Sequence, residues 1–276
     1  MKKALLALSL VASFSAYAKQ PTLLDELSRL LQIPESKAPA DVSRGTNQPT
    51  DFRACSQFFA NGAPPVVPHA QQLKPRELCY DAFAVLHSGS SKTPVFVAER
   101  LSRAQLENDK SGKRSDKFFS DARLPRGERA ELDDYKNSGY SRGHLAPAGN
   151  MSTPQAMAQS FSLANMVPQA PKNNQKPWNG IEEATRKYAL RAKGDVYVIT
   201  GPVFDGSPKT IGDNRVWVPK YLYKLVYDAA TGRAWAHWIE NNDDARAGKP
   251  ISYPELVRRT GIEFLPKAKI TGQAEE

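Results

Sequence analysis

The sequence predicts an α+β fold. Five runs of apolar and β-branched residues, often bounded by Gly, Ser or Pro, are typical of strands. Helix signals stand between and after these runs, without the regular strand-helix alternation of a parallel βαβ protein. No internal repeat is visible, which argues against solenoids and propellers. The strands are predicted at residues 79–86, 94–98, 196–200, 216–227 and 233–239.

The first 18 residues have the pattern of a secretory signal peptide. Lys2 and Lys3 precede an apolar run from Ala4 to Phe14, and Ala16 and Ala18 form a small-x-small cleavage site. The run is short for a membrane span of about 20 residues, so an uncleaved anchor is the weaker alternative. We therefore expect an exported protein, periplasmic or secreted, that has no membrane attachment after cleavage.

Residues 19–50 are predicted to form an N-terminal helix and a linker. Leucines between Leu23 and Leu31 recur at helical spacing, and Pro34 ends the run. The following stretch is rich in Pro, Ser, Gly and Asn and poor in large apolar residues. This segment either docks on the domain, mediates a homodimer or stays mobile. The compact domain is expected to span residues 51–276.

Three helices are predicted inside that domain. Thr153 caps a helix that begins with Pro154, and Pro177 opens a longer helix that runs through Leu190. A third helix covers 253–260 and ends at Gly261.

Cys55 and Cys79 are the two cysteines of the sequence. An exported chain meets oxidising conditions, so the even count favours one disulfide bond. Such a bond closes a loop of about 25 residues and stabilises the fold by about 3 kcal/mol in the chain-entropy model. The two cysteines lack C-x-x-C spacing, which argues against a metal role.

The chain is basic, with a formal net charge of +9. Lys2 and Lys3 leave with the signal peptide, so the mature chain carries 9 − 2 = +7. Such an excess raises the local concentration of polyanions, and nucleic acid is the obvious one. A basic surface that serves solubility is the alternative.

His144 is the strongest candidate for a catalytic base. It lies in a Gly-rich, Pro-bounded segment where a strand would turn into a loop, and such positions often carry function. A neutral imidazole accepts a proton from water at physiological pH. A structural or exposed histidine is the alternative, and that interpretation is kept for the other three histidines, His69, His87 and His237.

Asn174, Glu182 and Arg186 are predicted to share one helix face. Asn174 and Glu182 are eight residues apart, slightly more than two turns, if the helix extends back to Asn174. Arg186 follows Glu182 by four residues. An amide, a carboxylate and a guanidinium suit a hydrated Mg²⁺ ion that holds a phosphate. A solvated helix face with a Glu–Arg pair is the alternative.

Arg142 precedes His144 by two residues, so both point to one side of an extended strand. A guanidinium grips phosphate oxygens where charge accumulates in a transition state. An ion pair of Arg142 with Asp133 or Asp134 is the alternative.

These residues also carry a family resemblance. Tyr140–Ala148 resembles the D-R-G-H-x-x-P-A signature of the DNA/RNA non-specific endonucleases, the ββα-metal nucleases. The segment from Asn174 through Trp178 to Ile181-Glu182 is similar to that family's N-x3-W-x2-L-E helix. Similar pieces extend over roughly 79–266, at 94–100, 161–169, 200–204 and the 217–227 strand with Lys224.

The resemblance implies a ββα-metal nuclease fold with a mixed or antiparallel sheet and inserted helices. It implies His144 as general base, Asn174 as the direct protein ligand of Mg²⁺ or, alternatively, Mn²⁺, and Glu182 as a ligand through water. Arg142 and Arg186 would contact phosphate, and Arg114 matches a further arginine that stabilises the transition state.

The implied function is an exported endonuclease that hydrolyses DNA and RNA without sugar specificity and leaves 5′-phosphate ends. A catalytically weakened nucleic-acid-binding protein is the alternative. DNA against RNA preference, oligomeric state, biological role and any inhibitor protein stay open.

Ser141 stands where the family has aspartate. Strand alternation points Ser141 away from the side that Arg142 and His144 share, so we expect activity to survive.

Overall fold

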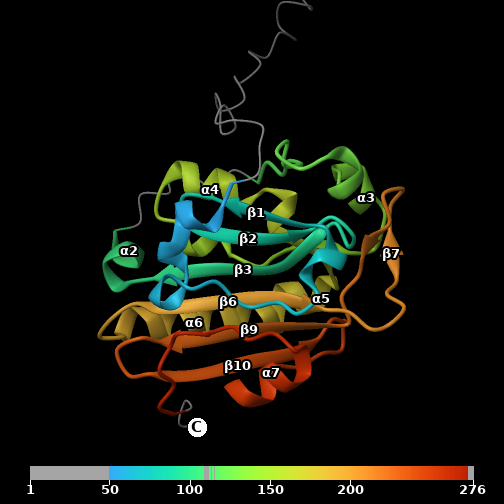
Figure 1. The fold of residues 1–276 in the computed structure, drawn as a ribbon. Coiled ribbons are helices and arrows are strands. Elements are labelled where there is room, and N and C mark those ends of the chain that lie inside the picture. The colour runs from blue at the N-terminus through green and yellow to red at the C-terminus, as the bar shows by residue number, and fades with distance from the viewer. Residues whose placement is uncertain (1–49, 109–111, 113, 115, 273–276) are drawn as a thin grey trace, which may run out of the picture. The chain divides into compact units, whose positions relative to one another are not determined.

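The computed structural model describes residues 50–108, 112, 114 and 116–272, and its centre is a seven-stranded sheet (Figure 1). All neighbouring strands of this sheet pair antiparallel. The predicted α+β class is confirmed. In spatial order the strands are β1 (Pro75–Cys79), β2 (Phe83–Ser88), β3 (Thr93–Leu101), β6 (Val196–Val203), β9 (Tyr221–Asp228), β10 (Arg233–Glu240) and β11 (Ile251–Ser252).

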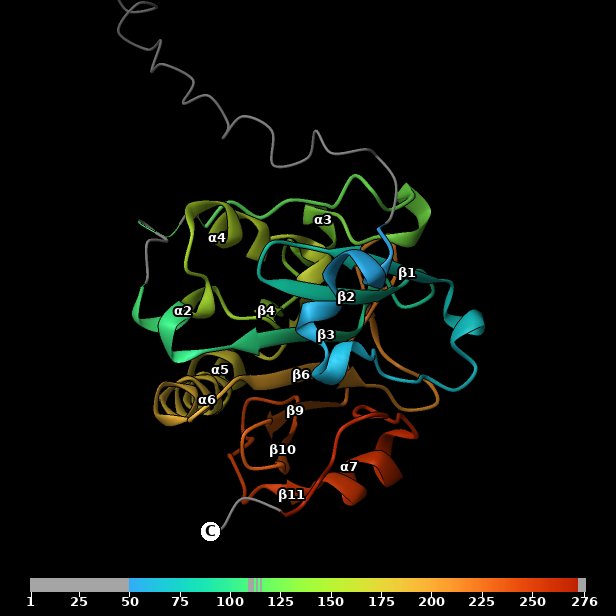
Figure 2. The ribbon, with the colours of Figure 1, turned by 60° about the vertical axis from the view of Figure 1, so that its left-hand side comes forward.

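Both faces of the sheet are buried, and side chains of the central strands alternate between apolar clusters on the two faces. On β3, for example, Phe96 and Ala98 join one cluster and Val97 joins the other. The first cluster packs under the 3-10 helix η1 (Phe52–Phe58) and α7 (Tyr253–Thr260). The second packs under the elements that follow β3, including α6 (Asn179–Arg191). Figure 2 shows α6 and α7 on opposite sides of β9 and β10.

The remaining elements are short. Two 2-stranded sheets lie outside the central one, β4 (Ser141–His144) with β5 (Met166–Gln169) and β7 (Thr210–Ile211) with β8 (Val216–Trp217). The other helical elements are η2 (Ala60–Gly62), η3 (Ala70–Leu73), α2 (Arg103–Glu107), η4 (Arg126–Glu128), α3 (Leu132–Tyr135), η5 (Ala148–Asn150), α4 (Pro154–Ser160), η6 (Leu163–Asn165), α5 (Pro171–Asn173) and the π turn η7 (Asn174–Trp178).

Two predicted strands have different bounds in the structure. The 79–86 run covers the end of β1, a turn at 80–82 and most of β2. The 216–227 run is divided between β8 and β9 at 218–220. Pro219 has no N–H for a ladder hydrogen bond, which is one reason for the break. The other three predicted strands lie inside β3, β6 and β10.

Helix signals located two of the helices well. Thr153 accepts a hydrogen bond from the backbone N–H of Ala156 and caps α4, as predicted. Gly261 closes α7 with φ = 71°, a left-handed conformation that favours glycine.

The predicted disulfide joins Cys55 of η1 to Cys79 of β1, with a Cα–Cα distance of 5.8 Å. It ties η1 to the edge of the sheet. The predicted signal peptide and N-terminal helix lie outside the described residues. No helix within the described part of the chain combines the length and the apolar character that crossing a bilayer requires.

Candidate active site

The candidate site is built from a hairpin-like pair of strands and the helix that follows. Strands β4 and β5 pair antiparallel, with His144 opposite Met166 and Ser141 opposite Gln169. A Cβ atom at Gly143 would lie 2.1 Å from Oε1 of Gln169. Only glycine therefore allows the two strands to pack this closely while Gln169 stays buried.

The helix that follows begins earlier than predicted. Helical backbone runs from Pro171 through the π turn η7 into α6, so Pro177 lies inside the helix and does not open it. A π turn inserts one extra residue into an α-helix. About seven residues make two turns of an α-helix, and the π turn adds one more residue. The eight residues from Asn174 to Glu182 therefore span about two turns, which places both side chains on one face.

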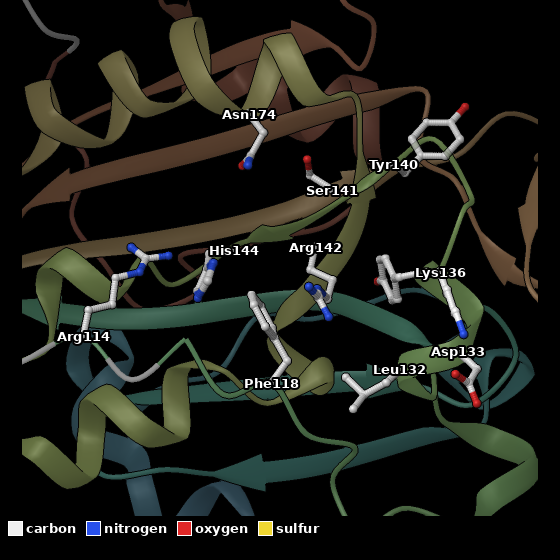
Figure 3. Close-up of a pocket in the computed structure, with 11 residues that line it drawn as sticks. Arg114, Phe118, Leu132, Asp133, Lys136, Tyr140, Ser141, Arg142, His144 and Asn174 are labelled. Atoms are coloured by element: carbon white, nitrogen blue, oxygen red, sulfur yellow. The ribbon is translucent and has the colours of Figure 1, made fainter.

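Two adjoining cavities meet at three of the predicted residues, Arg114, His144 and Asn174, which line both. The strand-side cavity has a volume of about 630 Å³ and is also lined by Phe118, Leu132, Asp133, Tyr135, Lys136, Tyr140, Ser141 and Arg142 (Figure 3). The helix-side cavity has a volume of about 470 Å³ and is also lined by Pro147, Ala148, Gly149, Gln175, Asn179, Glu182 and Arg186. The structure thus brings together all six predicted site residues.

His144 has a neutral imidazole with a free buried nitrogen. Burial lowers the pKa of His144 to about 3, and the guanidinium of Arg114 acts in the same direction. Its Nε2 atom is buried without a hydrogen-bond partner among the described residues. The ring stands 5.0 Å from the Phe161 ring, and the indole N–H of Trp178 donates to the His144 carbonyl at 3.4 Å. The ring is held in place by packing and is unprotonated at neutral pH.

Arg142 packs on an aromatic ring and forms no ion pair with a carboxylate of the described residues. Its guanidinium carbon lies 4.0 Å from the centre of the Phe118 ring. Within the described ranges it forms no ion pair with Asp133 or Asp134. The alternative interpretation of Arg142 as a structural ion pair is therefore wrong. Its charge is available to a ligand in the strand-side cavity.

The predicted alternation at Ser141 is confirmed, but Ser141 still lines the site. Figure 3 shows Ser141 and Arg142 on opposite sides of the strand, as alternation requires. The Ser141 side, however, is the side of Asn174, and Ser141 lines the same cavity as Arg142 and His144. It does not point away from the site, because the helix that carries Asn174 packs across the other side of β4.

A buried ionic network lies beneath the helix-side cavity, and the sequence did not reveal it. Glu99 and Lys224 are each about 1% exposed and stand on the sheet face under β4 and the helix. Lys224 donates to Oγ1 of Thr200 at 2.8 Å and to the carbonyl of Leu145 at 3.2 Å. The signal was a lysine inside an apolar strand run, where a charge is rarely buried unless it is paired.

The network reaches the predicted site through Glu182. Burial raises the pKa of Glu182 to about 7, against the opposing effect of Lys224 and Arg186. Burial likewise raises the pKa of Glu99 to about 7, and Lys224 opposes that rise. Oε1 of Glu182 is buried without a partner among the described residues.

Asn150 connects the network to Arg186. Its amide donates to Oε1 of Glu99 at 3.0 Å and accepts from Nη1 of Arg186 at 3.1 Å. Asn150 is 4% exposed, so this bridge is shielded from water. Arg186 is therefore oriented by an amide that the sequence analysis did not single out.

A family model described as DNA/RNA non-specific endonuclease matches residues 66–269, well over half of the sequence. The chain belongs to this family. The predicted resemblance is confirmed, and family members depend on a divalent metal ion.

Relatives in the endonuclease family carry related names. Human "Nuclease EXOG, mitochondrial" is 38% identical over 159 residues, which are 54% of this chain and 43% of the human protein. Human "Endonuclease G, mitochondrial" is 37% identical over 221 residues, 72% of this chain and 71% of that protein. A Nostoc protein named "Nuclease" is 34% identical over 200 residues, 66% and 70% of the two chains. The match to the EXOG nucleases of human and zebrafish spans less than half of their length.

A solved structure has the same fold. The structure titled "Crystal structure of the EndoG/EndoGI complex: Mechanism of EndoG inhibition" superposes with a TM-score of 0.66. It covers 81% of this chain and 96% of the other at 23% identity. The predicted ββα-metal nuclease fold is therefore confirmed.

The residues of this endonuclease chain fit a hydrated divalent cation. No group of three or more His, Cys, Asp or Glu residues with metal-site geometry exists in the part of the chain that the structure describes. The site offers instead the Asn174 amide and a buried oxygen of Glu182 that has no hydrogen-bond partner among the described residues, both at the helix-side cavity. Mg²⁺ is usually bound by one or two protein oxygens and keeps several water molecules and a substrate phosphate as its other ligands. This site has few protein oxygens and leaves room for water and phosphate.

Proposed function

We propose that this chain is an endonuclease that hydrolyses phosphodiester bonds of DNA and RNA with Mg²⁺ as cofactor and leaves 5′-phosphate ends. The observation that carries the proposal is the neutral imidazole of His144, which lines the same two cavities as Asn174 in a chain of this family. The reacting phosphate would lie where those cavities meet.

Each predicted residue has a distinct task in this reaction. His144 accepts a proton from the attacking water, and its free Nε2 has no competing partner among the described residues. Arg142 and Arg186 grip phosphate oxygens from the two cavities, and Arg114 faces the phosphate at their junction.

The cation site is supplied by Asn174, with Glu182 acting through water. When bound, a divalent cation supplies charge neutralisation at the phosphate and the leaving oxygen. The arginines and the cation ligands contact the sugar-phosphate backbone, which carries no sequence information directly. The net charge of the mature chain, 9 − 2 = +7, supports attraction to such a backbone.

We also propose that the protein is exported to the periplasm or the medium. The supporting observations are the signal-like pattern of residues 1–18 and the disulfide between Cys55 and Cys79, which suits an oxidising compartment. Several relatives are named as mitochondrial proteins, and that word applies to those proteins. Cell fractionation with an antibody tests the destination. Retention in the cytoplasm with residues 1–18 intact would contradict it.

A supercoiled-plasmid assay tests the activity. We expect nicking and then degradation with Mg²⁺, complete inhibition by EDTA, and 5′-phosphate groups on the products. His144→Ala removes the general base and Asn174→Ala removes the amide that would hold the cation, so each should lower the rate by at least about 100-fold. His69→Asn is the matched control, because His69 is exposed, lines neither cavity and has a left-handed φ of 54° that asparagine accepts.

Two results would overturn the proposal. A mobility shift of DNA without any cutting would support the nucleic-acid-binding alternative. Near-normal nicking by His144→Ala, with a melting temperature equal to that of the unsubstituted protein, would remove the imidazole from the reaction.

A further inference from the structure

We propose that the strand-side cavity is a subsite for one unstacked nucleoside next to the scissile phosphate, so that the enzyme prefers single-stranded substrates. The inference rests on the proposed function. It adds a place for the base, whereas the residues assigned above act on the phosphate, water and cation.

The position of the cavity follows from the residues that both cavities share. The reacting phosphate lies near His144 and Asn174, which line both. A strand that passes across this point therefore places one neighbouring nucleotide toward each cavity. The strand-side cavity, at about 630 Å³, is within the range of roughly 300–1,000 Å³ that is typical of small-molecule sites.

The two cavities differ in chemistry. Among the described residues, His144 is the one aromatic side chain that lines the helix-side cavity. The strand-side cavity combines the aromatic rings of Phe118, Tyr135 and Tyr140 with the cations of Lys136 and Arg142. A nucleotide has the same two parts, a flat ring that stacks on aromatic side chains and an anionic phosphate.

Leu132 is unusual in this cavity. It is 42% exposed, and among the described residues only Val66 is also a large apolar side chain with comparable exposure. Leu132 follows Glu131 at the start of α3 and lines the cavity. An exposed leucine on the cavity lining gives a base an apolar surface to cover. Of the described lining residues, Asp133 is the one carboxylate, against the cations of Arg114, Lys136 and Arg142.

The wall that carries these residues is anchored. Asp134 is 2% exposed, and its carboxylate accepts hydrogen bonds from the backbone N–H of Glu131 at 2.7 Å and from both nitrogens of Asn214 at 3.0 and 2.9 Å. A Cβ atom at Gly212 would stand 2.3 Å from Asp134. The α3 segment is thus fixed on the turn between β7 and β8 and gives the cavity a preformed shape.

A preformed pocket for a base selects single strands. A base in a duplex is paired and stacked, and taking it out has a free-energy cost that is least for a base already in a single strand. We therefore expect single-stranded DNA and RNA to be cut faster than duplexes of the same sequence.

Abasic oligonucleotides test the subsite directly. A labelled single-stranded oligonucleotide carries one tetrahydrofuran residue, which keeps the phosphates and lacks the base. We expect the unsubstituted enzyme, with Mg²⁺, to cut one bond beside that residue about tenfold more slowly than the same bond in the normal strand, given the usual contribution of base–aromatic stacking. Bonds farther away serve as internal controls.

Variants separate the subsite from a structural role. Tyr140→Ala should cut the abasic and normal bonds at equal rates, whereas Tyr140→Phe should keep the tenfold difference. Lys136→Ala changes an exposed residue and should raise KM for oligonucleotides several-fold, whereas Lys187→Ala, an exposed lysine that lines neither cavity, should not.

The outcomes also separate this inference from the proposed function. An active enzyme that cuts both bonds beside the abasic residue at the normal rate overturns the subsite alone. An active enzyme whose Tyr140→Ala variant is folded and keeps the tenfold difference also overturns it. Failure to cut any substrate overturns the endonuclease itself.

Discussion

Asn150→Ala is the most informative substitution outside the predicted site. Asn150 is buried and bridges two charged partners, Oε1 of Glu99 at 3.0 Å and Nη1 of Arg186 at 3.1 Å. A hydrogen bond to a charged group contributes about 1.5–3 kcal/mol. Water can replace the bond at Arg186, which is partly exposed, but not the one at the buried Glu99. We expect a loss of about 2–4 kcal/mol in the free energy of unfolding.

That loss corresponds to a fall in melting temperature of roughly 5–15 °C for a domain of this size. Differential scanning calorimetry measures it. Activity should fall as well, because Arg186 loses the amide that orients it toward the helix-side cavity. We expect kcat/KM on plasmid DNA, measured well below the melting transition, to fall about tenfold, as expected for the loss of one such hydrogen bond.

A double-mutant cycle checks the route of the effect. If Asn150 acts through Arg186, then Asn150→Ala combined with Arg186→Ala should be no slower than Arg186→Ala alone. Two losses in kcat/KM that multiply would show that Asn150 acts by another route. A melting temperature within about 2 °C of the unsubstituted protein would refute the reasoning on stability.

Four further outcomes are expected. Ser141→Asp should change the plasmid-cleavage rate by less than about tenfold, and a gain of orders of magnitude would show that the serine limits the site. Lys224→Met removes the positive charge near the buried carboxylates of Glu99 and Glu182. It should lower the free energy of unfolding, measured by chemical denaturation, by about 3–5 kcal/mol, and a loss below about 1 kcal/mol would mean that the three groups are not coupled. Burial lowers the pKa of His237 to about 4 from 6.5, so the unfolded chain binds more protons between these values and stability falls as the pH drops through that window. His237 alone should lower the free energy of unfolding by roughly 2 kcal/mol between pH 7 and pH 5. The His237→Gln variant should therefore lose correspondingly less stability over that pH range. Replacing Cys55 and Cys79 by serine should lower the free energy of unfolding by about 3 kcal/mol, and the double variant should be no less stable than either single variant.

The sequence predicted those strands and helix ends that are specified by residues close to one another in the chain. Apolar and β-branched runs located β3, β6 and β10, and Gly261 marked the end of α7. The same logic put Arg142 and His144 on one side of a strand, and both line the strand-side cavity. The bounds at β8 and β9 were missed because Pro219 interrupts a run that is mostly apolar on both sides of it.

Features that depend on contacts between distant segments were not visible. Glu99 and Lys224 stand on different strands of one sheet face, and only the strand order β3-β6-β9 brings them together. The π turn at 174–178 likewise has no simple local signal, because Pro177 equally suggests the start of a helix. The strand-side wall depends on Asp134 meeting Asn214, which are 80 residues apart.

The most direct test is a crystal structure of the His144→Ala protein with Mg²⁺ and a short single-stranded oligonucleotide. We expect one phosphate between position 144 and Asn174, with the cation bound to the Asn174 amide. A phosphate bound on another face of the protein, or a cation that does not touch Asn174, would contradict the assignment of this site to phosphodiester hydrolysis.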